Sequence, residues 1–271
     1  MSEPVEREPV PPHPWLSDFY GERDERAAFV RRLFNETASF YDGINKLYSL
    51  GSGASYRRRC LVRAGLHPGQ RLIDVATGTG MVAQEAVAVT GCRQDVIGVD
   101  LSEAMLAIAR NKLDIPLIQG VAEQLPVADA SADFVTMGYA LRHVSDLVTA
   151  FREFHRVLRK DGTVLLLEIG KPTRKLGRVV AQTYLGRLVP LLSRWLSGGE
   201  RAQALTQYYW ATIDQCVAPE IILKALGDSG FVELRCDVEL DMMRSYVGRK
   251  RNPATITAAK PGHDAGGNDC M

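Results

Sequence analysis

A glycine-spaced loop follows a short apolar run in the sequence LIDVATGTG, residues 72–80, and such a loop can hold an adenosine-bearing cofactor. Gly78, Gly80 and Ala83 match the G-x-G-x-x-A spacing of a strand-to-helix turn that binds a dinucleotide. Asp100 follows Gly80 by 20 residues, where an acid that binds ribose is expected. The pattern alone fits a nicotinamide dinucleotide and S-adenosylmethionine equally well.

Two further features of the loop favour S-adenosylmethionine. Asp74 ends the apolar run, and a carboxylate there would repel a pyrophosphate but attract the ammonium group of a methionine moiety. The loop is also preceded by helical patterning, whereas many dinucleotide-binding domains open on this strand. The glycines let the backbone approach the ligand without a side chain in the way. The predicted cofactor contacts of the loop are Asp74, Ala76, Thr77, Gly78 and Gly80.

The ends of the next strands complete the predicted cofactor site. Asp100 can accept both ribose hydroxyls through its two carboxylate oxygens, and Ser102 is able to cap the following helix in its place. Within GVAEQLPV, residues 120–127, Ala122 and Glu123 can lie near the adenine, unless Glu123 is a solvated loop acid. The remaining predicted cofactor contacts are Leu101, Met105 and Gly138.

These residues must be positioned by alternating strands and helices. Between residues 71 and 169, nearly continuous apolar runs alternate with amphipathic stretches, which indicates a parallel sheet with helices on both faces. The strands are expected at 71–77, 95–101, 116–122, 132–139 and 163–169, and the helices at 80–90, 102–112 and 146–159.

The rhythm changes after Ile169. Residues 172–215 are helical in composition and are expected to form an insertion on the acceptor side, and a helix ending at Gly230 follows. The stretch 231–250 contains two strands joined too closely for a crossover helix, so this pair is expected to be antiparallel. The predicted fold is α/β, a doubly wound, mostly parallel seven-stranded sheet with an antiparallel C-terminal strand.

The two ends of the chain differ from this domain. Residues 1–14 contain five prolines and predict a disordered or extended arm, and residues 251–271 have the same character. Amphipathic spacing between residues 24 and 50 predicts helices that precede the first strand and serve as a lid. A single domain is therefore expected over residues 15–250.

Composition limits the function classes. The 271 residues include 33 basic and 32 acidic ones, so there is no electrostatic reason to expect a nucleic-acid partner. The five cysteines form no C-x-x-C pair or histidine-associated spacing, so no metal site is expected, and they suit a reduced, cytoplasmic protein. The sequence shows neither a secretory signal nor an apolar stretch long enough to cross a bilayer.

Six segments carry a resemblance to a known family: LFNETASFYDGIN, LIDVATGTG, VIGVDLSEAML, GVAEQLPVADASADFVTMGYALRHVSD, FREFHRVLRKDGTVLLLEIGKP and YVGRK. In order from about residue 29 to 250, they resemble the ubiquinone/menaquinone biosynthesis C-methyltransferase family, a branch of the class I S-adenosylmethionine-dependent methyltransferases. The glycine loop is common to many class I enzymes. The segments typical of the quinone branch are Tyr41-Asp42, Leu141-Arg142 and LEIGKP. The resemblance implies C-methylation of a quinol-like, prenylated ring.

The sequence departs from the family pattern at four positions. Thr77 replaces a loop glycine, Val121 stands where a polar residue is common, and His143 replaces an asparagine. In TIDQCVAPE, a segment expected to shape the acceptor pocket, Asp214 replaces an arginine. The predicted cofactor survives these changes, whereas other acceptors stay open: a phenolic, polyketide or terpenoid metabolite. A cofactor-binding partner protein without transferase activity and a nicotinamide oxidoreductase are the remaining alternatives.

The predicted catalytic residues are Tyr41, Arg142 and His143, the last two just beyond the fourth strand. Carbon is a poor nucleophile unless a neighbouring ring hydroxyl is ionised, so a group that removes or stabilises that proton helps methyl transfer. Arg142 stays protonated and would stabilise the phenolate, while His143 is the candidate expected to titrate near neutrality. As alternatives, Arg142 caps a helix or pairs with Asp146, His143 is structural, and Tyr41 is a packed aromatic.

The stretch 178–196 separates into two halves on a helical projection, and Pro190 is expected to kink or divide it. One half carries Val180, Tyr184, Leu188, Leu191, Leu192 and Trp195, and the other carries Arg178, Gln182, Thr183, Arg187 and Arg194. The favoured interpretation is a lid packed over the sheet. An apolar wall for a prenyl tail, or a surface in peripheral contact with a membrane, is the alternative. A lipophilic small-molecule acceptor is the expected partner, and the sequence leaves a homodimer open.

Overall fold

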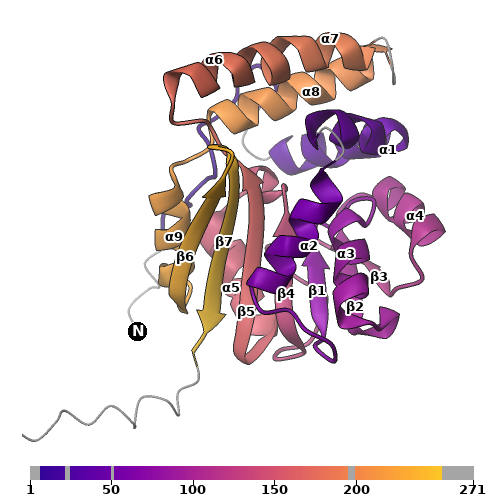
Figure 1. The fold of residues 1–271 in the computed structure, drawn as a ribbon, viewed down its shortest axis with the longest axis vertical. Coiled ribbons are helices and arrows are strands. Elements are labelled where there is room, and N and C mark those ends of the chain that lie inside the picture. Colours follow the sequence, from indigo (N-terminus) through magenta and orange to yellow (C-terminus); the bar gives the residue numbers. More distant parts are fainter. Residues whose placement is uncertain (1–6, 22–24, 50–51, 195–198, 252–271) are drawn as a thin grey trace, which may run out of the picture.

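A seven-stranded sheet organises the computed structural model, which describes residues 7–21, 25–49, 52–194 and 199–251. Its strands are β1 (Leu72–Val75), β2 (Val96–Asp100), β3 (Leu117–Gln119), β4 (Ala132–Gly138), β5 (Leu158–Ile169), β6 (Phe231–Glu239) and β7 (Met243–Lys250). They lie in the order β3-β2-β1-β4-β5-β7-β6 (Figure 1). The strand order reverses between β1 and β4, so the carboxyl ends of these strands form the position where open α/β sheets bind ligands.

The strand directions confirm the predicted topology. The pairs β1–β2, β1–β4, β2–β3 and β4–β5 are parallel, whereas β7 pairs antiparallel with both β5 and β6. Residues 240–242 alone join β6 to β7, which is too short for a parallel crossover. β5 begins at Leu158, earlier than the predicted 163, because Leu158 pairs with Ala132 ahead of a register shift.

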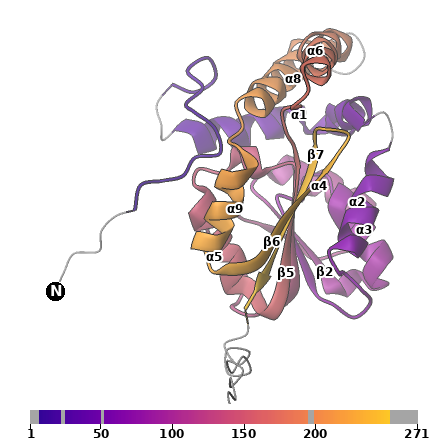
Figure 2. The ribbon, with the colours of Figure 1, turned by 60° about the vertical axis from the view of Figure 1, so that its left-hand side comes forward.

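Side chains alternate between the two faces of the sheet and build two cores. Ile73 and Val135 point to one face, where they pack against α5 and α9, while Leu72 and Phe134 point to the other, against α2 and α3 (Figure 2). These helices are α2 (Gly53–Arg63), α3 (Met81–Thr90), α5 (Leu147–Val157) and α9 (Pro219–Asp228). The sequence pattern indicates helical structure before β1 but does not separate α2 from the preceding helix.

A helical cap lies across the carboxyl ends of the parallel strands (Figure 1). It consists of α1 (Glu25–Ser49), α6 (Lys175–Thr183), the π-helical turn η3 (Tyr184–Leu188), α7 (Val189–Ser193) and α8 (Gly199–Asp214). Pro190 lacks an N–H group and its ring crowds the preceding turn, which accounts for the widened turn before it. The predicted helical stretch 172–215 is thus divided, and Trp195 lies outside the described residues. None of the described helices is both long and apolar enough to cross a membrane.

The N-terminal arm corrects one expectation. Residues 7–14 are extended, but they pack on the domain instead of forming a disordered arm. The Val10 N–H donates to Asp146 Oδ1 (2.6 Å), the Val217 N–H donates to the Pro12 carbonyl (2.8 Å), and the His13 side chain is buried. Residues 1–6 and 252–271, which include most of the predicted tail, lie outside the described residues.

Candidate active site

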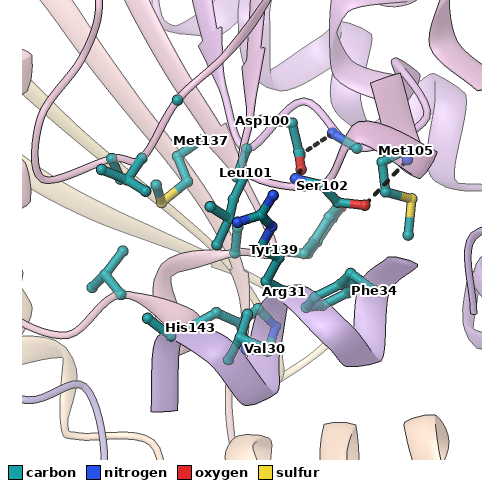
Figure 3. A pocket seen from close by; sticks show the side chains of 18 of the residues that line it. Val30, Arg31, Phe34, Asp100, Leu101, Ser102, Met105, Met137, Tyr139 and His143 are labelled. Carbon is teal, nitrogen blue, oxygen red and sulfur yellow. Dashed lines mark hydrogen bonds between the residues drawn. The ribbon is translucent and has the colours of Figure 1, made fainter. Parts of the chain in front are cut away.

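A cavity of about 860 Å³ lies between the cap and the carboxyl ends of β1, β2 and β4. One wall comes from α1 and the opposite wall from the segments that follow the strands, as the side chains in Figure 3 show. Eight of the eleven predicted cofactor residues line it: Ala76, Gly78, Asp100, Leu101, Met105, Ala122, Glu123 and Gly138. Asp74, Thr77 and Gly80 lie behind this wall.

Asp74 holds the glycine loop from inside. Its carboxylate accepts hydrogen bonds from the Thr77 hydroxyl (2.6 Å), the Thr136 hydroxyl (2.7 Å) and the Ala83 N–H (3.1 Å). Burial raises the pKa of Asp74 to about 6, although these three hydrogen bonds act in the opposite direction. The carboxylate therefore fixes the loop, and its direct contact with a methionine ammonium group stays a prediction.

The loop backbone is left-handed at three positions. Gly78 has a φ of 57° and Gly80 a φ of 85°, while Ala76 adopts a φ of 53° with a side chain in place. At Gly80 a Cβ would lie 2.4 Å from Leu113 Cδ1, so both the backbone conformation and the close contact require glycine. Thr77, where the family has glycine, uses its side chain to bond Asp74.

Asp100 ends β2 and faces the cavity (Figure 3). Its two oxygens accept hydrogen bonds from the N–H groups of Gly78 (2.7 Å) and Ser102 (2.8 Å), which fix the carboxylate relative to the loop. Burial raises its pKa to about 6, because the charged form loses hydration. Ser102 caps α4 (Glu103–Lys112) through the Met105 N–H (3.2 Å), so Asp100 is not needed as the cap.

The segment after β3 closes the far end of the cavity. Glu123 Oε1 accepts a hydrogen bond from the Ser145 N–H (2.6 Å), and Val121 pairs with Gln124 in an isolated bridge. Glu123 is half-buried and bonded, so the interpretation as a solvated loop acid is wrong. Ala122 lies beside it in the cavity wall.

Helix α1 supplies the wall that sequence reasoning largely missed. Its cavity-lining residues are Ala27, Val30, Arg31, Phe34 and Tyr41, spaced three, four and seven residues apart. Asp42 accepts a hydrogen bond from the Thr79 hydroxyl (2.5 Å) and pairs with Lys112, so α1 is tied to the glycine loop and to α4. The helical spacing carried this signal, but the sequence does not show which face of α1 turns toward the cavity.

A second cavity of about 530 Å³ adjoins the first, since Tyr41 and Tyr139 line both. Arg142 lines this second cavity and is absent from the wall of the first. Its guanidinium pairs with Glu168 (Nε to Oε1, 2.8 Å) and donates to the Thr212 hydroxyl (2.7 Å). Burial lowers the pKa of Arg142, but the charge of Glu168 more than offsets this and the net pKa is raised. The alternative pairing with Asp146 is wrong, because Asp146 caps α5 and pairs with Arg7.

Arg57 is a second cation in this cavity that the sequence did not single out. It lines the pocket from α2 and forms a hydrogen bond with Tyr139. Its Nε atom is buried and has no hydrogen-bond partner among the described residues. The second cavity therefore combines two guanidinium groups with the aromatic rings of Tyr41, Tyr48, Tyr139 and Tyr209.

His143 differs from its sequence-based interpretation. Its ring stacks on Tyr208, with centroids 5.3 Å apart, and its Nδ1 atom lies 3.1 Å from the Tyr208 hydroxyl. Burial, together with the charges of Arg142 and Arg26, lowers its pKa well below 6.5. The expectation that it titrates near neutrality is wrong, and a neutral imidazole lines the first cavity.

Two other residues named from the sequence have clear positions. Burial raises the pKa of Tyr41, so its phenol is neutral where the two cavities meet. Asp214 pairs with Lys171 (2.8 Å) at the end of α8 and lines neither cavity. Within the described residues, no group of three His, Cys, Asp or Glu side chains could hold a metal ion.

Comparisons with solved structures place this geometry in a known fold. A possible histamine N-methyltransferase from Thermotoga maritima, itself described as S-adenosylmethionine-dependent, superposes with a TM-score of 0.59 at 19% identity, covering 82% of this chain and 99% of that one. Phosphoethanolamine N-methyltransferase 2 from Haemonchus contortus, in complex with S-adenosylmethionine, gives a TM-score of 0.56 at 18% identity, covering 82% and 60%. Both show the class I methyltransferase fold.

Sequence comparisons are more specific. Residues 21–237 match the ubiE/COQ5 methyltransferase family. A demethylmenaquinone methyltransferase from Symbiobacterium thermophilum is 31% identical over 84% of this chain and 95% of that protein. The ubiquinone/menaquinone biosynthesis C-methyltransferase UbiE of Coxiella burnetii is 30% identical over 79% and 86%. The nicotinamide alternative is thereby set aside, and S-adenosylmethionine is the methyl donor. The chain belongs to the ubiE/COQ5 methyltransferase family.

Proposed function

We propose that the protein transfers a methyl group to a ring carbon of a prenylated quinol, as in ubiquinone and menaquinone biosynthesis. The observation that carries this proposal is the second cavity, in which two guanidinium groups and four tyrosine rings surround a space next to the cofactor cavity. Such a wall suits a flat aromatic ring that bears an ionised oxygen. The names of the related demethylmenaquinone and UbiE methyltransferases support the same class of acceptor.

The first cavity fits the methyl donor. Asp100 offers a fixed carboxylate for ribose hydroxyls, the φ of 57° at Gly78 keeps the loop backbone close to the ligand, and Leu101 and Met105 provide apolar contacts for adenine. Arg31 brings a positive charge to the same cavity from α1, opposite Asp100, where it can meet the carboxylate of a methionine moiety (Figure 3). When bound, S-adenosylmethionine supplies an electrophilic methyl group.

The acceptor is activated in the second cavity by charge. Arg142 keeps its proton and is locked by Glu168 and Thr212, so it presents a fixed positive charge to an oxygen of the ring. Arg57, with its unpartnered Nε, provides a second donor. Because the pKa of His143 is lowered so far, its imidazole is a weak base, and stabilisation of the phenolate by the arginines is the larger effect.

Tyr41 and Tyr139 connect the two halves of the site. Both rings line both cavities, so they can hold an acceptor ring next to the donor and exclude water from the space between. The acceptor is a lipophilic small molecule, and the protein works in the cytoplasm with peripheral access to a membrane. The roles assigned here to Arg142, Tyr41 and the cofactor residues belong to this proposal.

The test is methyl transfer in vitro. The purified protein is incubated with S-adenosylmethionine and a reduced demethylated quinone with a short prenyl tail, and the products are identified by mass spectrometry. We expect a product with one additional ring methyl group. A panel of phenolic acceptors without a tail serves as the comparison, and preferential methylation of a phenol on oxygen would reject the proposal in favour of another small metabolite.

A further inference from the structure

Helices α6 and α7 and the turn η3 expose an apolar surface away from the sheet. We call this surface the outer stripe, and its members are Leu176, Val179, Val180, Leu188 and Leu191. They account for five of the ten exposed large apolar residues of the described chain. Leu176 is 76% exposed and Leu191 is 54% exposed, so these side chains contribute little to the core. A concentration of this kind on one face marks an interaction surface.

The opposite face of the same segment is firmly packed. Ala181, Leu185 and Val189 are buried against side chains that include Tyr48 and Met242. The Tyr184 hydroxyl donates to the Leu47 carbonyl (2.9 Å), which fixes η3 to the end of α1. The outer stripe therefore faces outward because of the fold itself, along the edge of the cap in Figure 1.

The hairpin between β6 and β7 extends this surface. Leu240 at its tip is 86% exposed, the highest value among the exposed large apolar residues. The neighbouring Asp241 accepts hydrogen bonds from the Thr173 hydroxyl (2.5 Å) and the Arg174 N–H (3.1 Å), which anchors the tip to the start of α6. Leu240 thus lies next to the end of the outer stripe.

The charges around the outer stripe have one sign. Residues 171–199 contain six basic residues and no acidic residue, although the whole chain has 33 basic and 32 acidic residues. Five of the six are exposed and form no ion pair with any described residue: Arg174, Lys175, Arg178, Arg187 and Arg194. The nearest acids are Asp241, whose oxygens are occupied, and Glu200 in the first turn of α8.

We propose that the outer stripe lies in the surface of an anionic lipid bilayer, parallel to the membrane. Apolar side chains on an in-plane helix bury themselves at the boundary of headgroups and acyl chains, and flanking arginines bind anionic headgroups. The long arginine side chains also lie along the apolar surface while their charged ends reach the headgroups. The uncompensated positive charge selects an anionic membrane over a neutral apolar partner.

This orientation places the acceptor cavity beside the membrane. Tyr48 packs against the inner face of α6 and η3 and also lines the second cavity, and Met243, next to Met242, lines it too. A single layer of side chains thus separates the membrane-facing helices from the cavity. This link to a membrane-borne acceptor rests on the proposed function, whereas the binding of lipid does not.

Vesicle cosedimentation tests the inference. The full-length protein is mixed with vesicles of about 30% phosphatidylglycerol in phosphatidylcholine, and separately with pure phosphatidylcholine. We expect binding to the anionic vesicles that falls as salt concentration rises, and at least tenfold weaker binding to the neutral ones. Equal binding to both, or no binding to either, would overturn the proposal.

Matched variants locate the surface. Val180→Ser with Leu191→Ser is compared with Val62→Ser and Ile221→Ser, which are exposed apolar residues on α2 and α9. Only the first pair is expected to weaken binding, by about tenfold or more. Because all four side chains are exposed, folding is expected to be retained, and S-adenosylhomocysteine affinity checks this for each variant. Equal binding by the two pairs would exclude the outer stripe as the contact surface.

A second set of variants tests the charges. Arg178→Gln with Arg187→Gln is expected to weaken binding to anionic vesicles by about thirtyfold, at about fivefold for each basic residue near the surface. The control, Arg152→Gln with Lys160→Gln, removes the same charge from exposed positions in α5 and β5 and leaves binding within about twofold. Equal losses in both variants would mean that net charge alone drives binding, and would reject a defined surface.

Sedimentation velocity and the methylation assay distinguish membrane binding from a contact between two copies of the chain and from the proposed function. If sedimentation velocity shows a dimer that the Val180→Ser, Leu191→Ser variant converts to a monomer, and vesicles do not bind, the stripe is a contact between two copies and the proposal fails. Binding to vesicles without methylation of any quinol would instead reject the proposed function and support this inference. Methylation without vesicle binding would reject the inference alone.

Discussion

The two cavities of the active site are built from different parts of the chain. Apart from residues of α1, the wall of the cofactor cavity comes from the single stretch 76–145. The acceptor cavity draws its wall from α1, α2, α8, β7 and the segments after β4 and β5, between Tyr41 and Met243. A cofactor site of this kind is local in sequence, whereas the acceptor site exists only once distant segments have folded together.

The difference has a consequence for how each site responds to change. The cofactor loop is held by hydrogen bonds among near neighbours, such as Thr77 to Asp74, so a substitution there acts first on ligand affinity. The acceptor cavity contains the buried pair Arg142–Glu168, which joins β5 to the segment after β4. A substitution in this pair acts on stability and on turnover together, and the two effects must be separated by design.

The largest effect is expected from Arg142→Ala. The change leaves the Glu168 carboxylate buried without its partner, which lowers the free energy of unfolding by about 3–5 kcal/mol. Turnover is expected to fall by roughly a hundredfold or more, as when a fixed charge at the reacting oxygen is removed. Denaturant unfolding and steady-state kinetics measure the two effects.

The double variant Arg142→Met with Glu168→Leu provides the control. Replacing a buried ion pair by apolar residues of similar size is often neutral or stabilising, so we expect the unfolding free energy to recover. Turnover should stay low because the charge is still missing. Recovery of both properties would contradict the role of Arg142 in stabilising the phenolate and would leave it a structural residue.

The next effect concerns the affinity for the cofactor. Asp100→Asn removes the charge that strengthens hydrogen bonds to ribose hydroxyls, and bonds of this type contribute about 1.5–3 kcal/mol. We expect S-adenosylhomocysteine to bind about ten- to a hundredfold more weakly in titration calorimetry, with acceptor affinity unchanged. The matched control is Asp95→Asn, a partly exposed acid ahead of β2 that lines neither cavity. An unchanged affinity in the Asp100 variant would remove Asp100 from the cofactor site.

The same substitution is expected to stabilise the protein without ligand. Burial raises the pKa of Asp100 from 3.8 to about 6, so the folded state binds protons more tightly, and stability is lost as the pH rises from about 4 to about 6. The shift corresponds to about 3 kcal/mol, of which the loss of one backbone hydrogen bond offsets about 1 kcal/mol. Asp100→Asn should therefore add about 1–2 kcal/mol at pH 7.5 and less at pH 4. A gain that does not depend on pH would point to a cause other than the buried charge.

The fold was the part of the molecule most accessible from sequence. Continuous apolar runs such as VIGV in β2 specify a buried parallel strand, and the short link between β6 and β7 specifies their antiparallel pairing. The boundaries were less accessible, because β5 is lengthened by pairing with β4 that no local pattern records. The packing of residues 7–14 on the domain depends likewise on hydrogen bonds to Asp146 and Val217, far along the chain.

The site was accessible to different degrees. Glycine spacing and an acid at the end of the next strand identified Gly78 and Asp100, because each is needed at a fixed place in a strand-to-helix turn. His143 was misjudged because its pKa depends on burial and on Arg26 and Arg142, which only the fold brings together. Nothing local distinguishes Arg57 from the two arginines that follow it.

Asp74 distinguishes two ways of supporting the same ligand. Asp74→Asn keeps the size of the side chain but disturbs the hydrogen bonds from Thr77, Thr136 and Ala83, and we expect about tenfold weaker binding of S-adenosylhomocysteine. Methylthioadenosine, which lacks the amino acid part, is the informative second ligand. If Asp74 acts through the loop, both ligands lose affinity equally. If it contacts the ammonium group directly, methylthioadenosine binding is unchanged.

The smallest expected effect belongs to Arg57, and it tests whether the acceptor cavity can be altered without the cofactor cavity. Arg57 is partly exposed and has no ion-pair partner among the described residues, so Arg57→Gln should change the unfolding free energy by no more than about 0.5 kcal/mol. Removing a charge at such a site contributes about 1 kcal/mol, which corresponds to a roughly fivefold higher KM for the acceptor.

The neighbouring Arg58→Gln is the control, because Arg58 pairs with Glu85 and lies outside both cavities. For Arg57→Gln we expect the affinity for S-adenosylhomocysteine to be unchanged, and Arg57→Lys to restore part of the KM because the positive charge returns to the pocket. Such a result means that the two cavities recognise their ligands independently, although they share Tyr41 and Tyr139. A loss of cofactor affinity in Arg57→Gln would instead mean that the shared tyrosines couple the two cavities, since Arg57 forms a hydrogen bond with Tyr139.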